Sequence, residues 1–346
     1  MPHSSKVVFT IKKPFAVINK QITTYLSRRA HRSFRLTKRR DYKRSLKLPG
    51  YFAFTHSVNK TLWQYRKKFI WLAAVYAILT TVLVGIGSQD TYNTLSSTLK
   101  DTGSQIFQGD FGQLGQAALL FVSIGSTGLT ASPTEGQQIY IVILGLLIWL
   151  TTVWLLRNLL AGHRIKMRDS LYSAGAPIVA TFLVTLVLIL QLVPIGIAVI
   201  GYSAANSAGL LNGGVEAMLF WVAASFLAIT SLYWITSTFF ALIIVTLPGM
   251  YPGKALRTAS DMVASRRLRI LLRILWMLGV IIIAGAVIII PTILIDTGLT
   301  NIWPVITKVP VVPVILMLFG VLTFIWSASY IYLLYRKVVD DDAKPA

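Results

Sequence analysis

Cysteine is absent from this chain of 346 residues. That absence excludes disulfides, thiolate metal sites and cysteine nucleophiles together. The four histidines lack a second metal ligand at a typical spacing; they are His3, His31, His56 and His163. The sequence also has no phosphate-binding loop, dinucleotide fingerprint or G-x-S-x-G nucleophile motif. We therefore expect a protein that is not an enzyme and that needs no cofactor and no metal.

Charged residues are scarce as well. They make up 13% of the chain, about half of the roughly 25% that a typical soluble domain carries. Hydrophobic residues make up 55%, and the mean hydropathy is +0.67. So few charges could not cover the surface of a soluble fold, so the composition indicates an integral membrane protein.

Long apolar runs without a charged residue near their centres give the expected architecture. A helix needs about 20 apolar residues to cross a hydrocarbon core roughly 30 Å thick. Five runs reach that length and a sixth, the first in the chain, is slightly shorter. They are 69–87, 138–157, 177–201, 216–247, 270–295 and 311–335. Because helices satisfy their own backbone groups in lipid, we predict an all-α integral membrane fold, a six-helix transmembrane bundle spanning residues 69–337.

The basic residues predict the orientation. Segment 1–68 holds 18 of the 33 Lys and Arg against a single acid, Asp41. Lys and Arg collect in cytoplasmic loops, so we expect this arm and the tail 338–346 to be cytoplasmic. A seventh span at 114–133 would export the basic loops that follow it. We therefore predict an external or re-entrant hairpin there, and a bacterial cytoplasmic (inner) membrane as the location.

The arm itself combines apolar stripes with charge. Stripes at helical spacing from Phe15 to Leu26 and from Tyr51 to Tyr65 predict amphipathic helices on either side of a basic run. The second is expected either to lie in the headgroup region or to pack on cytoplasmic loops. The candidate contacts to anionic lipid, or alternatively to ribosomal RNA, are Arg28, Arg29, Arg32, Arg35, Lys38, Arg39, Arg40, Lys43, Arg44 and Lys47.

The predicted spans contain no ionisable residue near their centres, although such residues mark many transport pathways. Their polar residues, such as Thr151, Gln191 and Thr238, are explained by hydrogen bonds between helices. A path for an uncharged solute is the alternative explanation.

The loop at 250–265 carries the clearest motif. Pro252, Ala255, Leu256 and Ala259 match a P-x-x-A-L-x-x-A/S pattern on a short amphipathic helix. This pattern, placed between the fourth and fifth spans, resembles the bacterial glycerophosphoryl diester phosphodiesterase membrane-domain-like and YciC-like proteins. The resemblance covers the membrane part only and implies an all-helical bundle. Because no phosphodiesterase barrel accompanies it, the resemblance implies no such activity, and we expect the motif to be structural.

The functional hypothesis is a non-enzymatic multi-pass protein that organises a membrane complex or supports envelope or lipid homeostasis. Its expected partners are a bilayer with anionic lipids and other membrane proteins or copies of itself. A transporter or permease subunit is the first alternative, and a ribosome-binding membrane factor is the second.

Overall fold

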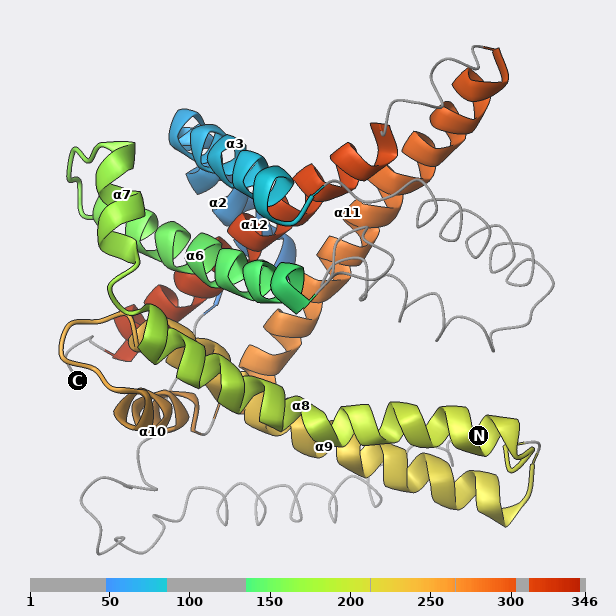
Figure 1. Ribbon diagram of the computed structural model, residues 1–346. Coiled ribbons are helices and arrows are strands. Elements are labelled where there is room, and N and C mark those ends of the chain that lie inside the picture. Colours follow the sequence, from blue (N-terminus) through green and yellow to red (C-terminus); the bar gives the residue numbers. More distant parts are fainter. Residues whose placement is uncertain (1–47, 86–134, 212, 265, 303–310, 343–346) are drawn as a thin grey trace, which may run out of the picture. The chain divides into compact units, whose positions relative to one another are not determined.

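The computed structural model describes residues 48–85, 135–211, 213–264, 266–302 and 311–342 (Figure 1). The chain divides into two units, Met1–Ser45 and Leu46–Ala346, and all the described residues belong to the second. Every regular element in the described ranges is an α-helix. In chain order these are α2 (Tyr51–Gln64), α3 (Arg66–Leu83), α6 (Glu135–Leu160), α7 (Met167–Ala174), α8 (Ile178–Ser207), α9 (Val215–Ile244), α10 (Pro252–Val263), α11 (Arg267–Ile302) and α12 (Val311–Asp342).

Five of these helices, α6, α8, α9, α11 and α12, are long and apolar enough to cross a membrane. The expectation of an all-helical, multi-pass membrane fold is confirmed to that extent. Four of them, α6, α8, α11 and α12, are longer than the predicted spans, whereas α9 ends three residues before the predicted end at 247. For example, Glu135 and Arg157 bound an uncharged stretch of α6, and at 1.5 Å per residue they lie about 33 Å apart along the axis. That distance matches a hydrocarbon core of roughly 30 Å.

The first predicted span, 69–87, corresponds to α3. This helix opens with Arg66, Lys67 and Lys68 and ends at Leu83, so its uncharged part is only about 22 Å long at 1.5 Å per residue. That is short for a full crossing, so six spans stay a prediction. The proposed hairpin at 114–133 lies outside the described residues, as does the arm up to residue 47.

Helices α8 and α9 pack along each other and are joined by polar contacts in their apolar stretches. The Thr238 hydroxyl donates to Oε1 of Gln191 at 2.6 Å, and Ser231 donates to the Gln191 carbonyl. Elsewhere, the hydroxyls of Thr151 and Tyr76 link α6 to α3 at 3.1 Å. Hydrogen bonds of this kind are an ordinary way to join membrane helices, so these residues need no solute path to explain them.

The buried core lies toward the C-terminal ends of α6, α9 and α12 and the start of α11. Leu155, Leu156, Phe240, Ile243 and Leu334 are all completely buried and belong to one cluster with residues of α2, α3, α10 and α11. Many of the basic residues in the described ranges lie at or near these helix ends. The tightest packing therefore coincides with the charged end of each helix.

The opposite halves of the long helices are mostly exposed. In α8, α9 and α11, Ile189, Leu190, Leu219, Phe226 and Ile283 each leave more than half of the side chain uncovered. Such an apolar surface would be costly in water but not against acyl chains, since lipid tails are as apolar as leucine. This distribution fits helices that are covered by lipid in one half and by one another in the other half.

The motif helix α10 follows α9 after a short turn and packs against α9 and α8. Pro252 occupies its first turn, where the missing N–H costs no hydrogen bond. Ala255, Ala259 and Val263 recur every four residues and are completely buried, whereas Leu256 is only partly buried. Small alanines on the buried face of α10 allow its backbone to approach the backbone of α9 closely.

We expect Ala259→Leu to destabilise the protein, because three extra carbon atoms have no room at a fully buried helix contact. Overpacking of this kind typically costs about 1–3 kcal/mol. Arg257→Leu is the matched control, since Arg257 is exposed on the same helix. Thermal melting of both variants in detergent tests this, and an equal melting temperature for the two would contradict close packing at Ala259.

A candidate anionic-ligand site at the basic end

All the Lys and Arg residues in the described ranges lie in α2, in α10, at the junctions between helices or within about two turns of a helix end. They are Lys60, Arg66, Lys67, Lys68, Arg157, Arg164, Lys166, Arg168, Lys254, Arg257, Arg266, Arg267, Arg269, Arg273, Arg336 and Lys337. Glu135 and Glu216 stand at the opposite ends, where α6 and α9 begin. The described helices are therefore polarised, with positive charge at one end.

Arg273 connects α11 to α2 and to the residues just before it. Its guanidinium donates to the Pro49 carbonyl and lies 4.2 Å from the centre of the Tyr51 ring, and the residue as a whole is 6% exposed. The Phe54 ring packs edge-on against Tyr330 of α12, with centroids 4.8 Å apart. A cation over an aromatic face is stabilised more strongly when water is excluded. One face of α2 is thus packed on the long helices α11 and α12, whereas the alternative expected for this helix was packing on cytoplasmic loops.

The other face of α2 is open. Phe52 and Trp63 are 78% and 70% exposed, and the Arg66 guanidinium lies 5.1 Å from the Trp63 ring centroid. Exposed aromatic rings beside basic residues are typical of the boundary between membrane and water. The headgroup location of this second face stays a prediction.

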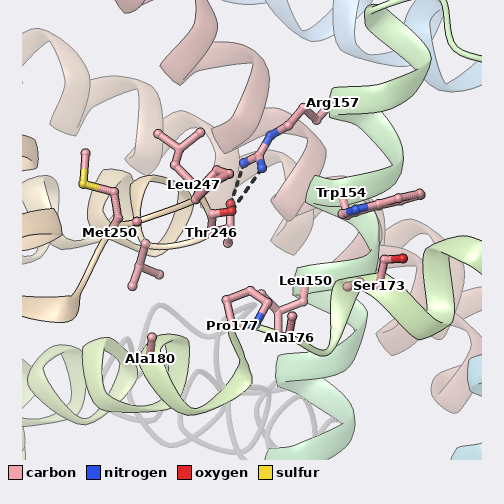
Figure 2. A pocket seen from close by; sticks show the side chains of 14 residues that line it. Leu150, Trp154, Arg157, Ser173, Ala176, Pro177, Ala180, Thr246, Leu247 and Met250 are labelled. Carbon is pink, nitrogen blue, oxygen red and sulfur yellow. Dashed lines mark hydrogen bonds between the residues drawn. The ribbon is translucent and has the colours of Figure 1, made fainter.

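Arg157 reaches from α6 to the end of α9. Its Nη1 donates to the Thr246 carbonyl at 3.1 Å, and its Nη2 donates to the Thr246 hydroxyl at 2.6 Å (Figure 2). The Thr246 hydroxyl in turn donates to the Ile243 carbonyl at 2.7 Å. A guanidinium has five N–H donors, so Thr246 occupies only two of them.

A cavity of about 530 Å³ adjoins this Arg157–Thr246 pair. Ligand pockets commonly have 300–1,000 Å³ and place a few polar groups among apolar side chains. Here Arg157 is the only charged residue in the lining. Apart from Arg157, the lining consists of Leu150, Trp154, Ser173, Ala174, Ala176, Pro177, Ala180, Val245, Thr246, Leu247, Pro248, Gly249 and Met250 (Figure 2).

Two helix ends also meet this cavity. The N-terminus of α8 has no side-chain cap, although the Ile178 N–H donates to the Gly175 carbonyl at 3.1 Å, and such an end carries partial positive charge. The C-terminus of α9 contributes the opposite partial charge, but there Arg157 already binds the Thr246 carbonyl. The guanidinium therefore makes the electrostatic potential in the cavity positive. A positive potential favours an anionic group.

The structure distributes the predicted site residues as follows. Pro252, Ala255, Leu256 and Ala259 lie together on α10, whereas the ten basic residues of 28–47 lie outside the described residues. Sequence analysis did not single out Arg157 or Thr246. The available signal was an arginine at the last position of a predicted span (138–157), and a threonine two residues before Pro248-Gly249. In the described part of the chain, no three His, Asp or Glu residues cluster as a metal site would require.

Comparison of the chain with protein-family models, with curated proteins and with solved structures finds no match. The resemblance carried by the α10 motif therefore stays a prediction.

Thr246→Val should destabilise the end of α9, because Arg157 loses the hydroxyl that accepts from Nη2. A hydrogen bond to a charged group contributes about 1.5–3 kcal/mol, and the half-buried guanidinium recovers part of that from water. Thr61→Val is the control, since the exposed Thr61 hydroxyl bonds only to the Ser57 carbonyl one turn away. The melting temperatures of the two variants in detergent test this. An equal fall in melting temperature would mean that the contact with Arg157 adds nothing to stability.

Proposed function

We propose that this chain is a non-enzymatic multi-pass protein of a bacterial cytoplasmic membrane whose basic end binds the anionic inner leaflet. In this proposal the protein organises a membrane complex or supports lipid or envelope homeostasis. The observation that carries the proposal is the polarised charge of the described helices. Basic residues surround the tightly packed ends, whereas the opposite halves expose apolar side chains.

This arrangement suits an anionic surface for a physical reason. A Lys or Arg near a leaflet rich in anionic lipid contributes about 1 kcal/mol of attraction. Arg164, Lys166 and Arg168 are exposed in the segment between α6 and α8, and Lys254 and Arg257 are exposed on α10. Together with the basic arm, they would hold the protein's cytoplasmic face against the leaflet.

The proposal includes six spans, with both termini in the cytoplasm, and α3 as the first crossing. The positive-inside rule supports this orientation, because it keeps the α6–α8 segment, α10 and the start of α11 inside. If α3 did not cross, the α2 region would lie on the same side as the start of α6. The topology of α2 therefore distinguishes five spans from six.

Single cysteines can test this topology without background, because the chain has none of its own. We expect Ser207→Cys to react with a membrane-impermeant maleimide in intact cells, and Ser57→Cys and Ser173→Cys to react only after permeabilisation. All three serines are exposed in the structure, so silence in intact cells would not reflect burial. Ser170 is unsuitable because it is completely buried.

The outcomes separate the models. Labelling of Ser57→Cys and Ser207→Cys in intact cells, with Ser173→Cys protected, would leave five spans and remove α3 as a crossing. Labelling of Ser173→Cys from outside would invert the orientation and overturn the proposal.

The arm is expected to bind lipid. A peptide of residues 1–47 ends before α2, whose packed face would otherwise be exposed. It should gain helix by circular dichroism on phosphatidylglycerol vesicles and much less on phosphatidylcholine vesicles. A control peptide with the ten basic residues of 28–47 changed to Gln should lose most of that response, since only four of its fourteen basic residues remain. Binding to ribosomes at physiological salt without any response to vesicles would instead favour the translation-linked alternative.

A further inference from the structure

Helix α2 is attached to the long helices at several points along its length. The Trp276 indole of α11 donates to the Thr55 hydroxyl at 3.1 Å, and the Trp326 indole of α12 donates to Oδ1 of Asn59 at 2.8 Å. Together with the bond from Arg273 to the residue before α2, these contacts hold its start and its middle. The face that α2 turns away from the bundle is therefore fixed in direction.

This outward face carries aromatic and basic side chains. Phe54 and Val58, one turn apart, are completely buried on the packed side. The opposite side carries four exposed residues that recur every three or four positions, which keeps them on one face of the helix. They form the outer face of α2 and are Phe52, His56, Lys60 and Trp63.

The surroundings of the outer face are basic and apolar at once. Residues 48–85 contain no Asp or Glu, and the Arg66 guanidinium lies 5.1 Å from the Trp63 ring centroid. In α3, which follows, Ile70 and Trp71 are also exposed. Tryptophan collects at headgroup level in membranes, and cations there are attracted to anionic lipid. A headgroup layer therefore suits both kinds of side chain, because its phosphates pair with the cations and its glycerol and upper acyl carbons cover the rings.

From these observations we propose that the outer face of α2 lies among the headgroups of the inner leaflet and binds anionic phospholipid, with phosphates at Lys60 and Arg66. The inference rests on the proposed position of the basic end at that leaflet. It adds a lipid contact made by the folded membrane part itself, separate from the arm. Since α11 and α12 already hold α2 in place, lipid binding to this face orders few further groups.

Fluorescence quenching in the full-length protein tests where this face lies. His56→Cys is labelled with the fluorophore NBD in lipid nanodiscs, both faces of which are open to solvent. A phosphatidylcholine nitroxide placed near the glycerol should quench this label about twofold more than one near the end of the acyl chain, because the label sits at the headgroups. Ile78→Cys should show the reverse order, since Ile78 is exposed on α3 and lies about 18 Å along the axis from Arg66. Ser173→Cys, exposed in α7, should be quenched mainly by aqueous iodide.

The charge of the lipid is tested with the same His56 label. Phosphatidylglycerol and phosphatidylcholine, each carrying the shallow nitroxide at the same low mole fraction, are compared in phosphatidylcholine nanodiscs. The phosphatidylglycerol form should quench about twofold more strongly, because anionic lipid collects beside the cations. Changing Lys60→Gln together with Arg66→Gln should make the two lipids equal. The matched control, Arg257→Gln with Lys337→Gln, removes the same charge from exposed positions outside α2 and α3 and should keep the difference.

Three results would overturn the inference. Iodide quenching of the His56 label as strong as that of the Ser173 label would place the outer face in water. A His56 label that neither iodide nor lipid nitroxides reach would show that protein covers this face. Equal quenching by the two lipids before any charge is removed would mean that the contact does not select anionic lipid. The Ile78 label reports on the crossing of α3 by itself, so a failure of the six-span proposal is distinguishable from a failure of this one.

Discussion

A charged side chain is costly in hydrocarbon, and this cost governs how the protein is built. Estimates for arginine at the centre of a membrane helix range from about 2.5 kcal/mol upward. The long helices accordingly have uncharged central stretches, and their Lys and Arg residues lie at one end. The arginines at that end then become available as packing groups, because they stand where helices from distant parts of the chain converge. Arg157 joins α6 to α9, and Arg273 joins α11 to the segment before α2.

The partners of these arginines have a common character. Arg157 binds a backbone carbonyl and a hydroxyl, and Arg273 binds a carbonyl and an aromatic face. Arg267 likewise stacks on the Tyr233 ring at 4.1 Å and donates to the Ser260 hydroxyl at 2.9 Å. Neutral acceptors and rings spread the charge over several weak contacts, and each arginine keeps its net positive charge. The folded end of the bundle is therefore both well packed and strongly basic.

The sequence was sufficient to predict most of the helices, because they depend on patterns of residues along the chain. Uncharged runs predicted α6, α8, α9, α11 and α12, because a membrane imposes a minimum length on any helix that crosses it. The short amphipathic helix α10 was also visible from Pro252 and the spacing of its alanines. The role of α3 was harder to judge, since its basic start shortens the apolar stretch. Hydropathy alone does not say where such a helix enters the membrane.

The candidate site could not be predicted in the same way. Arg157 looked like an ordinary boundary residue, and its importance comes from Thr246, which lies 89 residues later in the chain. Similarly, Arg273 meets a carbonyl 224 residues earlier. Such contacts depend on how helices are placed side by side, and no periodicity within one helix encodes that placement. The two faces of α2 illustrate the same limit, because its stripe predicted an apolar face but not whether lipid or α11 and α12 would cover it.

The same arginines connect the packing of the protein to its proposed use. An arginine that is half-buried at a helix end has part of its hydration replaced by protein acceptors, and Arg157 also lines the neighbouring cavity. A phosphate arriving there would meet a guanidinium whose position Thr246 already fixes, so little side-chain entropy remains to be lost on binding. A lysine could hold the same charge, but it lacks the planar fork that binds Thr246 and a phosphate at once. The geometry that stabilises the end of α9 thus also gives this cavity a positive group in a fixed position.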